Sequence, residues 1–289
     1  NRGSGIKAPV PTFNANYENE ISFGSVKVAL SDSKPIALIN DNNSNLFDFK
    51  LNGNKRIITD LNLYNDEPPG WFESLQSEGQ GAVGALYVTD ILTMYIAEGK
   101  KIGCNGILDY ENQISAHTAL TSFAEVLKEA SAKYLDIDPI ELNVGIQKKK
   151  EISCGTAQIF MADALENGAG YTRHIFKSNN LKDVLLVFYN DLQKFWESDR
   201  HANCDRSCYE CLRNYSNRHI HPNLDWRLAL DICEIVLGID LKTERWLEKA
   251  ETFANTFQTL CNGYGIETQI EYLSGLIGIK NNNQALILC

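Results

Sequence analysis

The chain has 289 residues, of which 44% are hydrophobic and 22% are charged, and its formal net charge is −10. These proportions exclude wholesale disorder, and no apolar run reaches the roughly 20 residues that cross a bilayer. The acidic balance excludes a generic basic nucleic-acid coat, so any nucleic-acid contact must come from a local patch.

The first third of the chain is expected to be rich in strands. Residues 1–19 are polar and predict an extended start. Residues 21–30 and 46–51 alternate apolar and polar side chains, and residues 35–40 form a short apolar run, which together indicate separate strands. The glycine-containing stretch 64–82 is expected to be a loop. We therefore assign residues 1–82 to a strand-rich lead-in region.

The middle of the chain mixes strands and helices. A β-branched and aromatic stretch at 85–98 predicts a strand, and apolar residues at helical spacing predict a helix over 115–135. Further strands are expected at 141–149 and 156–162, followed by a tight turn at Asn167-Gly-Ala-Gly-Tyr that opens a short helix. Asn180 is expected to cap the next helix.

The last part of the chain predicts helices over 224–236 and 243–262, then two strands around Asn281-Asn-Asn. The fold class is therefore α+β, with a strand-rich N-terminal third followed by mixed helices and strands. We assign residues 83–240 to one domain and 241–289 to a C-terminal helix and strand pair. The chain starts without Met and ends on an apolar run, so we expect a fragment of a longer polypeptide, truncated at this end.

Three of the eight cysteines fall within eight residues, in the spacing H-x2-C-x3-C-x2-C formed by His201, Cys204, Cys208 and Cys211. Zinc in a structural site takes four nitrogen or sulfur ligands in a tetrahedron, and a C-x2-C pair places two sulfurs on one ion. The spacing therefore predicts a structural Zn²⁺ site, a zinc knuckle between two helices. Eight cysteines are too few for a disulfide scaffold, and their use as metal ligands indicates a reducing cytoplasm.

The fourth ligand is less strongly specified than the three cysteines. His201 is the nearest candidate, and the alternatives are Cys154, His219, His221 and Cys233. An iron–sulfur cluster would call for a fourth nearby cysteine. A catalytic zinc would need an open position, and neither H-E-x-x-H nor H-x-E with P-C-x-x-C is present. A closed structural site is thus the preferred interpretation.

The residues around these cysteines resemble a known family. Residues 204–217 and 221–231 are similar to the MrfA-type zinc-binding (MZB) domain of DEAD/DEAH-box helicases and of DrmB-like proteins of the DISARM phage-defence system. Looser similarity extends over residues 35–235. The family pattern has four cysteines, the first of which would fall at Ala202, and the resemblance implies that His201 replaces it.

The resemblance also implies a function. It indicates a zinc-stabilised, non-catalytic module of a helicase-like or DISARM-like assembly, with DNA and a DEAD/DEAH-type helicase domain or subunit as partners and no membrane. The chain has no G-x-x-x-x-G-K-[ST] loop, so any motor activity would reside elsewhere. The arginines near the cysteines, accompanied by Tyr209 and Tyr215, are candidates for phosphate contact; they are Arg206, Arg213, Arg218 and Arg227. The alternative is a solvated surface of local ion pairs.

Two other functions remain open at this level. A metal-dependent nuclease could use Glu267 and Glu271, and a protein–protein scaffold would need no DNA contact. The Gly168-Ala-Gly turn could hold a phosphate, although a simple tight turn is the preferred interpretation. Asp90, Asp163 and Asp225 are interpreted as turn or cap residues.

Overall fold

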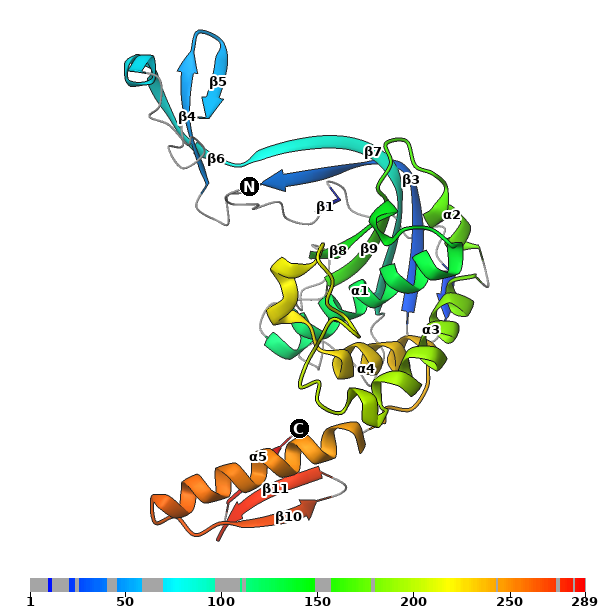
Figure 1. Ribbon diagram of the computed structural model, residues 1–289, viewed down its shortest axis with the longest axis vertical. Coiled ribbons are helices and arrows are strands. Elements are labelled where there is room, and N and C mark those ends of the chain that lie inside the picture. Colours follow the sequence, from blue (N-terminus) through cyan, green and yellow to red (C-terminus); the bar gives the residue numbers. More distant parts are fainter. Residues whose placement is uncertain are drawn as a thin grey trace.

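The chain folds around an antiparallel sheet, shown in the computed structural model of Figure 1. The structure describes residues 10–11, 21–23, 26–40, 46–58, 70–96, 110, 113–148, 157–177, 180–242, 244–273, 276–282 and 284–288. The sheet has the order β1-β3-β7-β9-β8, and β2 also pairs with β3. Its strands are β1 (Val10–Pro11), β2 (Ile21–Phe23), β3 (Val26–Asn40), β7 (Val83–Ile96), β8 (Leu142–Lys148) and β9 (Ala157–Asp163).

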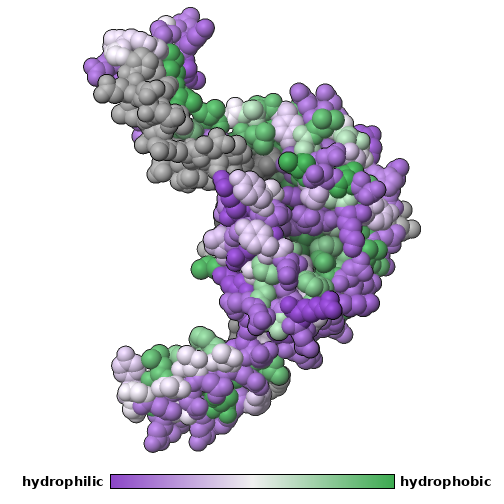
Figure 2. Space-filling model, viewed as in Figure 1, coloured by the Kyte–Doolittle hydropathy of each residue, from purple (hydrophilic) through white to green (hydrophobic). Residues whose placement is uncertain are grey.

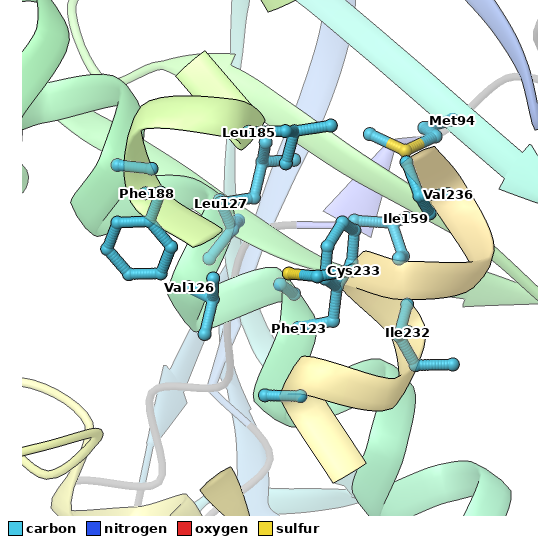
Figure 3. Close-up of a cluster of buried hydrophobic side chains, with 14 of the residues drawn as sticks. Met94, Phe123, Val126, Leu127, Ile159, Leu185, Phe188, Ile232, Cys233 and Val236 are labelled. Carbon is cyan, nitrogen blue, oxygen red and sulfur yellow. The ribbon is translucent and has the colours of Figure 1, made fainter. Parts of the chain in front are cut away.

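Helices cover one face of this sheet. They are α1 (Ile114–Leu135), α2 (Tyr171–Phe176), α3 (Asn180–Trp196) and α4 (Trp226–Leu237). Figure 3 shows the resulting core, in which Met94 of β7 and Ile159 of β9 lie near Val236 of α4, and Phe123 of α1 lies beside Cys233. The expected helices over 115–135 and 224–236 are confirmed within two residues at each end.

Both faces of the central strands are buried. On β9, Ile159 and Met161 join the helix-covered core, whereas Phe160 and Ala162 form a second, smaller cluster with Ile36 and Ile91. Successive side chains of a strand point to opposite faces, so every position of β9 can be buried while alternating between two cores. This explains why its sequence lacks polar alternation.

β3 is one strand where two were expected, so the predicted break is wrong. The register against β7 shifts between Ser31 and Lys34, and Ser33 has a φ of 51°. The Ser33 amide donates to the carboxylate of Asp90 at 3.0 Å. This side chain satisfies the irregular backbone, so the strand continues through a bulge instead of ending.

Beyond the bulge, residues 34–40 of β3 pair with residues 83–89 of β7. They leave the body as a two-stranded ribbon that leads to a small sheet (Figure 1). That sheet has the order β5-β4-β6, with β4 (Phe47–Asn52), β5 (Lys55–Ile58) and β6 (Gln76–Gly81), and a 3-10 helix spans Gly70–Ser74. The loop expected over 64–82 is therefore wrong for residues 70–81. Figure 2 shows hydrophobic residues along the ribbon, where Leu86 is 70% exposed.

The boundary expected at residue 82 falls just before β7. Because β3 and β7 are neighbours in one sheet, part of the expected lead-in region and part of the domain expected over residues 83–240 share a core. The sequence separation of these strands hides this pairing from local pattern analysis.

The C-terminal unit consists of α5 (Glu244–Gly263), β10 (Gln269–Leu273), β11 (Leu276–Asn281) and β12 (Gln284–Leu288). Its strands form a separate antiparallel sheet, so the expected strand pair has a third member. Ala254, Ile277 and Ile279 form a small core that is distinct from the main one. Figure 1 shows this unit on the opposite side of the body from the ribbon. Among the described helices, none combines the length and apolar character that crossing a membrane requires.

Candidate metal centre

The segment between α3 and α4, residues 197–225, is called the zinc loop below. It has little regular structure beyond two 3-10 turns, Asp199–His201 and Arg218–Asn223. His201, Cys204, Cys208 and Cys211 each direct one donor atom inward, and these atoms all lie within 4.8 Å of one another. The sequence-predicted ligands are thus brought together by the fold.

The distances between donors fit a tetrahedral ion. Cys208 Sγ lies 3.3 Å from His201 Nε2, 3.8 Å from Cys211 Sγ, and Cys204 Sγ lies 4.0 Å from Cys211 Sγ. With Zn–S of about 2.3 Å and Zn–N of about 2.0 Å, the edges of a zinc tetrahedron are about 3.5–3.8 Å. The four donors surround a position of the right size for zinc.

His201 is fixed by its other ring nitrogen. Nδ1 lies 3.1 Å from the carbonyl oxygen of Trp196, at the end of α3. A carbonyl can only accept, so Nδ1 carries the proton and Nε2 keeps its lone pair for a metal. The ring is buried and makes an edge contact with Trp226 at 5.3 Å between centroids. This second contact holds the imidazole plane.

The cysteine knuckle is held by its own backbone. The amide of Cys208 donates to Cys211 Sγ at 3.1 Å, and the amide of Arg213 donates to the Cys208 carbonyl at 2.9 Å. The indole Nε1 of Trp226 donates to the Cys204 carbonyl at 3.4 Å. An amide directed at sulfur stabilises the thiolate that a metal requires.

Burial opposes the thiolates until a metal binds. It raises the pKa of Cys204 to about 11, with the neighbouring Cys208 adding to the effect, and it also raises the pKa of Cys211. A divalent ion reverses this preference, so metal binding must release protons. Four protein donors leave no open coordination position, which suits a structural role and not Lewis-acid catalysis.

The other candidate ligands that the structure describes do not join the three cysteines. His221 Nε2 lies 3.1 Å from the Asn214 carbonyl and 3.0 Å from Asn217 Oδ1. Cys233 is buried on α4 within the main core, and His219 is exposed. Cys154 lies outside the described residues. Over the described part of the chain, His201 is thus the candidate that the fold brings to the three cysteines.

Comparison with known proteins finds a matching domain family for one part of the chain. Residues 123–212 match the family model described as the MrfA Zn-binding domain (MZB). Over these residues the chain is similar to an MZB domain. The match contains all four candidate ligands, and the metal for which the site is built is zinc. The resemblance noted from the cysteine cluster is confirmed over residues 204–212.

Two proteins resemble larger parts of the chain. Druantia protein DruE of Escherichia coli (strain UMEA 4076-1) is 30% identical over 162 residues, which is 54% of this chain and 8% of DruE. Crystal structures of the DUF1998 helicase MrfA bound to DNA, without and with AMPPNP, give TM-scores of 0.42 and 0.34 at 15% and 16% identity. They cover 73% and 65% of this chain, and 23% and 20% of MrfA. TM-scores below 0.5 do not establish a common fold.

The four arginines of the expected nucleic-acid patch fall into two groups in the structure. Arg206 lies 3.6 Å from Asp225, and Arg227 donates to the Asp205 carbonyl at 2.6 Å. These two therefore help to hold the start of α4. Arg213 donates to Ser207 Oγ at 2.9 Å, and Arg218 lies over the Tyr215 ring at 5.1 Å. The second pair follows the last cysteine.

Asp163 and Asp225 have the structural roles predicted for them, whereas Asp90 is neither a turn nor a cap residue, because it lies within β7 and accepts the Ser33 amide. Asp225 caps α4 by accepting the Arg227 amide at 3.0 Å. The Asp163 carboxylate accepts four successive amides, those of residues 169–172, at 2.7–3.1 Å. A carboxylate therefore already occupies the anion-binding position at the start of α2. The phosphate interpretation of the glycine turn is excluded, and the turn interpretation is confirmed.

Sequence reasoning did not identify a polar network behind the zinc loop. Asn217 Nδ2 donates to Glu125 on α1 at 3.0 Å and to the Leu212 carbonyl at 2.8 Å. Ser122, also on α1, accepts the amide of Asp225 at 2.8 Å. The available signal was the position of the polar Ser122 and Glu125 beside the apolar Phe123 and Val126 in the predicted helix.

The alternative nuclease carboxylates are not brought together. Glu271 pairs with Lys280 of β11 at 3.1 Å, and Glu267 is exposed on the loop before β10. Within the described ranges, the zinc group is the one set of three or more suitable side chains that could hold a metal.

Proposed function

We propose that this chain is a zinc-stabilised, non-catalytic module of a helicase-like protein, of the kind used in anti-phage defence assemblies such as DISARM. The observation that carries the proposal is the set of four converging donors within the MZB match. We further propose that His201, Cys204, Cys208 and Cys211 are the zinc ligands. Thiolate ligands require reduced cysteines, which favours a cytoplasmic location.

The chain spans about 8% of the length of DruE. We therefore infer that ATP hydrolysis and translocation, if the parent protein has them, belong to other domains or subunits. A DEAD/DEAH-type helicase domain is the partner that the MZB domain implies. The closed zinc site supports an architectural role, because it offers no position for a substrate.

DNA contact is proposed at the surface around and after the last cysteine of the cluster, Cys211. Tyr209 and Tyr215 are 72% and 80% exposed, and Arg213 and Arg218 lie close to them in sequence. Exposed aromatic rings stack on unpaired bases, and arginines contact phosphates. This combination favours single-stranded DNA, since the bases of a duplex have no free face.

The test measures DNA binding by the zinc-loaded chain across a salt series. We expect the double variant Arg213→Gln/Arg218→Gln to weaken single-strand binding and to lower the slope of log affinity against log salt by about 1.4, at roughly 0.7 per phosphate. Arg56→Gln is the matched control, because Arg56 is an exposed arginine paired with Glu78 on the small sheet.

Two outcomes would favour the alternatives. Absence of salt-dependent binding in the unchanged chain would support a protein–protein scaffold. Magnesium-dependent DNA cleavage that is lost in Glu267→Ala/Glu271→Ala would support a nuclease and contradict the non-catalytic role.

A further inference from the structure

The start of α5 inserts an arginine into a pocket of carboxylates. The Arg245 side chain is 3% exposed and contacts Glu234 and Asp231 of α4. It also lies 3.5 Å from Glu197, just beyond α3. The four residues are called the Arg245 cluster below. It joins three elements that have no continuous helical or sheet connection.

Further polar groups satisfy the carboxylates of the cluster, whereas the buried Nε of Arg245 has no hydrogen-bond partner among the described residues. The fully buried Glu234 accepts the Tyr189 hydroxyl at 2.7 Å and the Lys242 amide at 3.1 Å. Asp231 accepts the indole N–H of Trp246 at 2.9 Å. A buried charge is tolerated only with such partners, so displacement of Arg245 would leave Glu234 without its counter-ion. The cluster therefore fixes one position of α5.

A second contact connects α5 to the zinc loop. Lys249 lies one turn after Arg245, on the same face of α5. Its ammonium contacts the Asp205 carboxylate and donates to the Asp205 carbonyl at 2.7 Å. Asp205 directly follows the candidate ligand Cys204. The Asp205 carbonyl also accepts from Arg227 of α4 at 2.6 Å.

The zinc loop and α5 are thus held at the same short stretch of backbone. The amide of Trp226 donates to the Arg206 carbonyl at 2.9 Å, and its indole donates to the Cys204 carbonyl. Because Asp205 directly follows Cys204, a metal held by Cys204 would also fix the position of Asp205. The C-terminal unit has its own separate core, so charged contacts contribute much of its attachment to the body.

We propose that the Arg245 cluster and the Lys249–Asp205 contact form an intramolecular docking surface, and that zinc binding strengthens it. Zinc fixes the loop that presents Asp205, and Asp205 in turn holds the first turns of α5. Loss of zinc would release Lys249 while the Arg245 cluster stays formed. The C-terminal unit would then remain folded but be less firmly oriented. This proposal rests on zinc binding but not on DNA contact.

Hydrogen exchange of the full chain, followed by segment, tests this coupling. Removing zinc with a chelator is expected to raise exchange at least about threefold over residues 244–252, with little change over β10–β12. Lys249→Met in the zinc-loaded chain should reproduce the increase in α5. Lys280→Met is the matched control, because it removes an equal charge from a surface pair within the C-terminal unit. Zinc content is measured on the same samples.

Arg245→Met tests the cluster independently and should raise exchange over α5 more than Lys249→Met does. Unchanged α5 exchange in the zinc-free chain and in Lys249→Met would overturn the coupling. An increase of equal size over α1 and α5 on zinc removal would also overturn it, because zinc would then act on the whole fold. If the chain binds a full equivalent of zinc but α5 exchange does not respond to zinc removal, the docking proposal is refuted and the proposed metal site is not.

Discussion

The zinc loop and the core beneath it are in contact but differ in composition. The core is filled by apolar side chains from α1, α3, α4 and the sheet (Figure 3). The buried residues of the zinc loop include His201, Ser207, Asn217 and Asp225, which are polar. Apolar burial stabilises the core without a cofactor, whereas the loop depends on its ligands and hydrogen bonds. We therefore expect the core to be stable without metal and the zinc loop to need metal for its stability.

The largest expected effect on stability comes from a change in the zinc loop. Cys208→Ser should remove zinc and lower the unfolding free energy by about 4 kcal/mol or more, since loss of a metal is among the most damaging changes. For a chain of this size the Tm should fall by at least about 8 °C. Metal content and thermal unfolding measure both. Cys261→Ser on α5 is the control and should keep a full equivalent of zinc.

The core should behave in the opposite way. Leu127→Ala removes a fully buried side chain of α1 and should cost about 3 kcal/mol. Zinc content should stay at one equivalent, because the ligands lie on another segment. Urea unfolding and metal analysis test this. Loss of zinc in Leu127→Ala would show that zinc binding depends on the packing of the core, which contradicts the difference drawn between the two regions.

The Arg245 cluster should give a pH dependence of its own. Burial raises the pKa of Asp231 to about 6 despite the nearby Arg245, whose charge lowers it. The folded chain therefore holds a proton at this carboxyl that the unfolded chain releases near pH 4. The resulting stabilisation is complete below about pH 4 and is lost as the pH rises through 6.

Asp231→Asn cannot titrate and should lack this component. Between pH 5 and pH 7.5, the unchanged chain should lose about 1 kcal/mol more stability than the variant, in excess zinc. Urea unfolding at the two pH values measures the difference. Glu271→Gln, at an exposed surface pair, should follow the unchanged chain. An identical pH profile for Asp231→Asn would refute the elevated pKa.

The smallest effect concerns the junction of loop and core. Asp225→Ala removes the cap of α4 and should cost about 1 kcal/mol, in the usual range for a helix cap. Zinc should remain bound, since the ligands are unchanged. Thermal unfolding at fixed zinc concentration detects this loss. A larger loss accompanied by zinc release would show that Asp225 supports the metal site as well as the helix.

Local patterns predicted those features whose determinants lie close together in the sequence. The four donors span eleven residues, so spacing alone brought them together. The helix over α1 followed from its apolar period, and Asp225 was recognisable as a cap because it directly precedes α4. The spacing could not choose between His201 and the other fourth ligands; the contact of Nδ1 with the Trp196 carbonyl adds the orientation that makes His201 suitable.

Features that depend on distant partners were missed. The bulge in β3 exists because Asp90, 57 residues away, accepts the Ser33 amide. The Arg245 cluster joins α5 to carboxylates on two other elements, and nothing near Arg245 in the sequence indicates that it is buried. The grouping of the four expected arginines was missed for the same reason. Arg206 contacts Asp225 and Arg227 contacts the Asp205 carbonyl, and only the fold brings these partners together.

Zinc K-edge X-ray absorption of the purified chain tests the metal assignment most directly. We expect a four-coordinate site with three sulfur ligands at about 2.3 Å and one nitrogen at about 2.0 Å. His201→Ala should remove the nitrogen contribution. A spectrum with four sulfurs and no nitrogen would contradict the ligand set and would bring another cysteine, such as Cys154, into the site in place of His201.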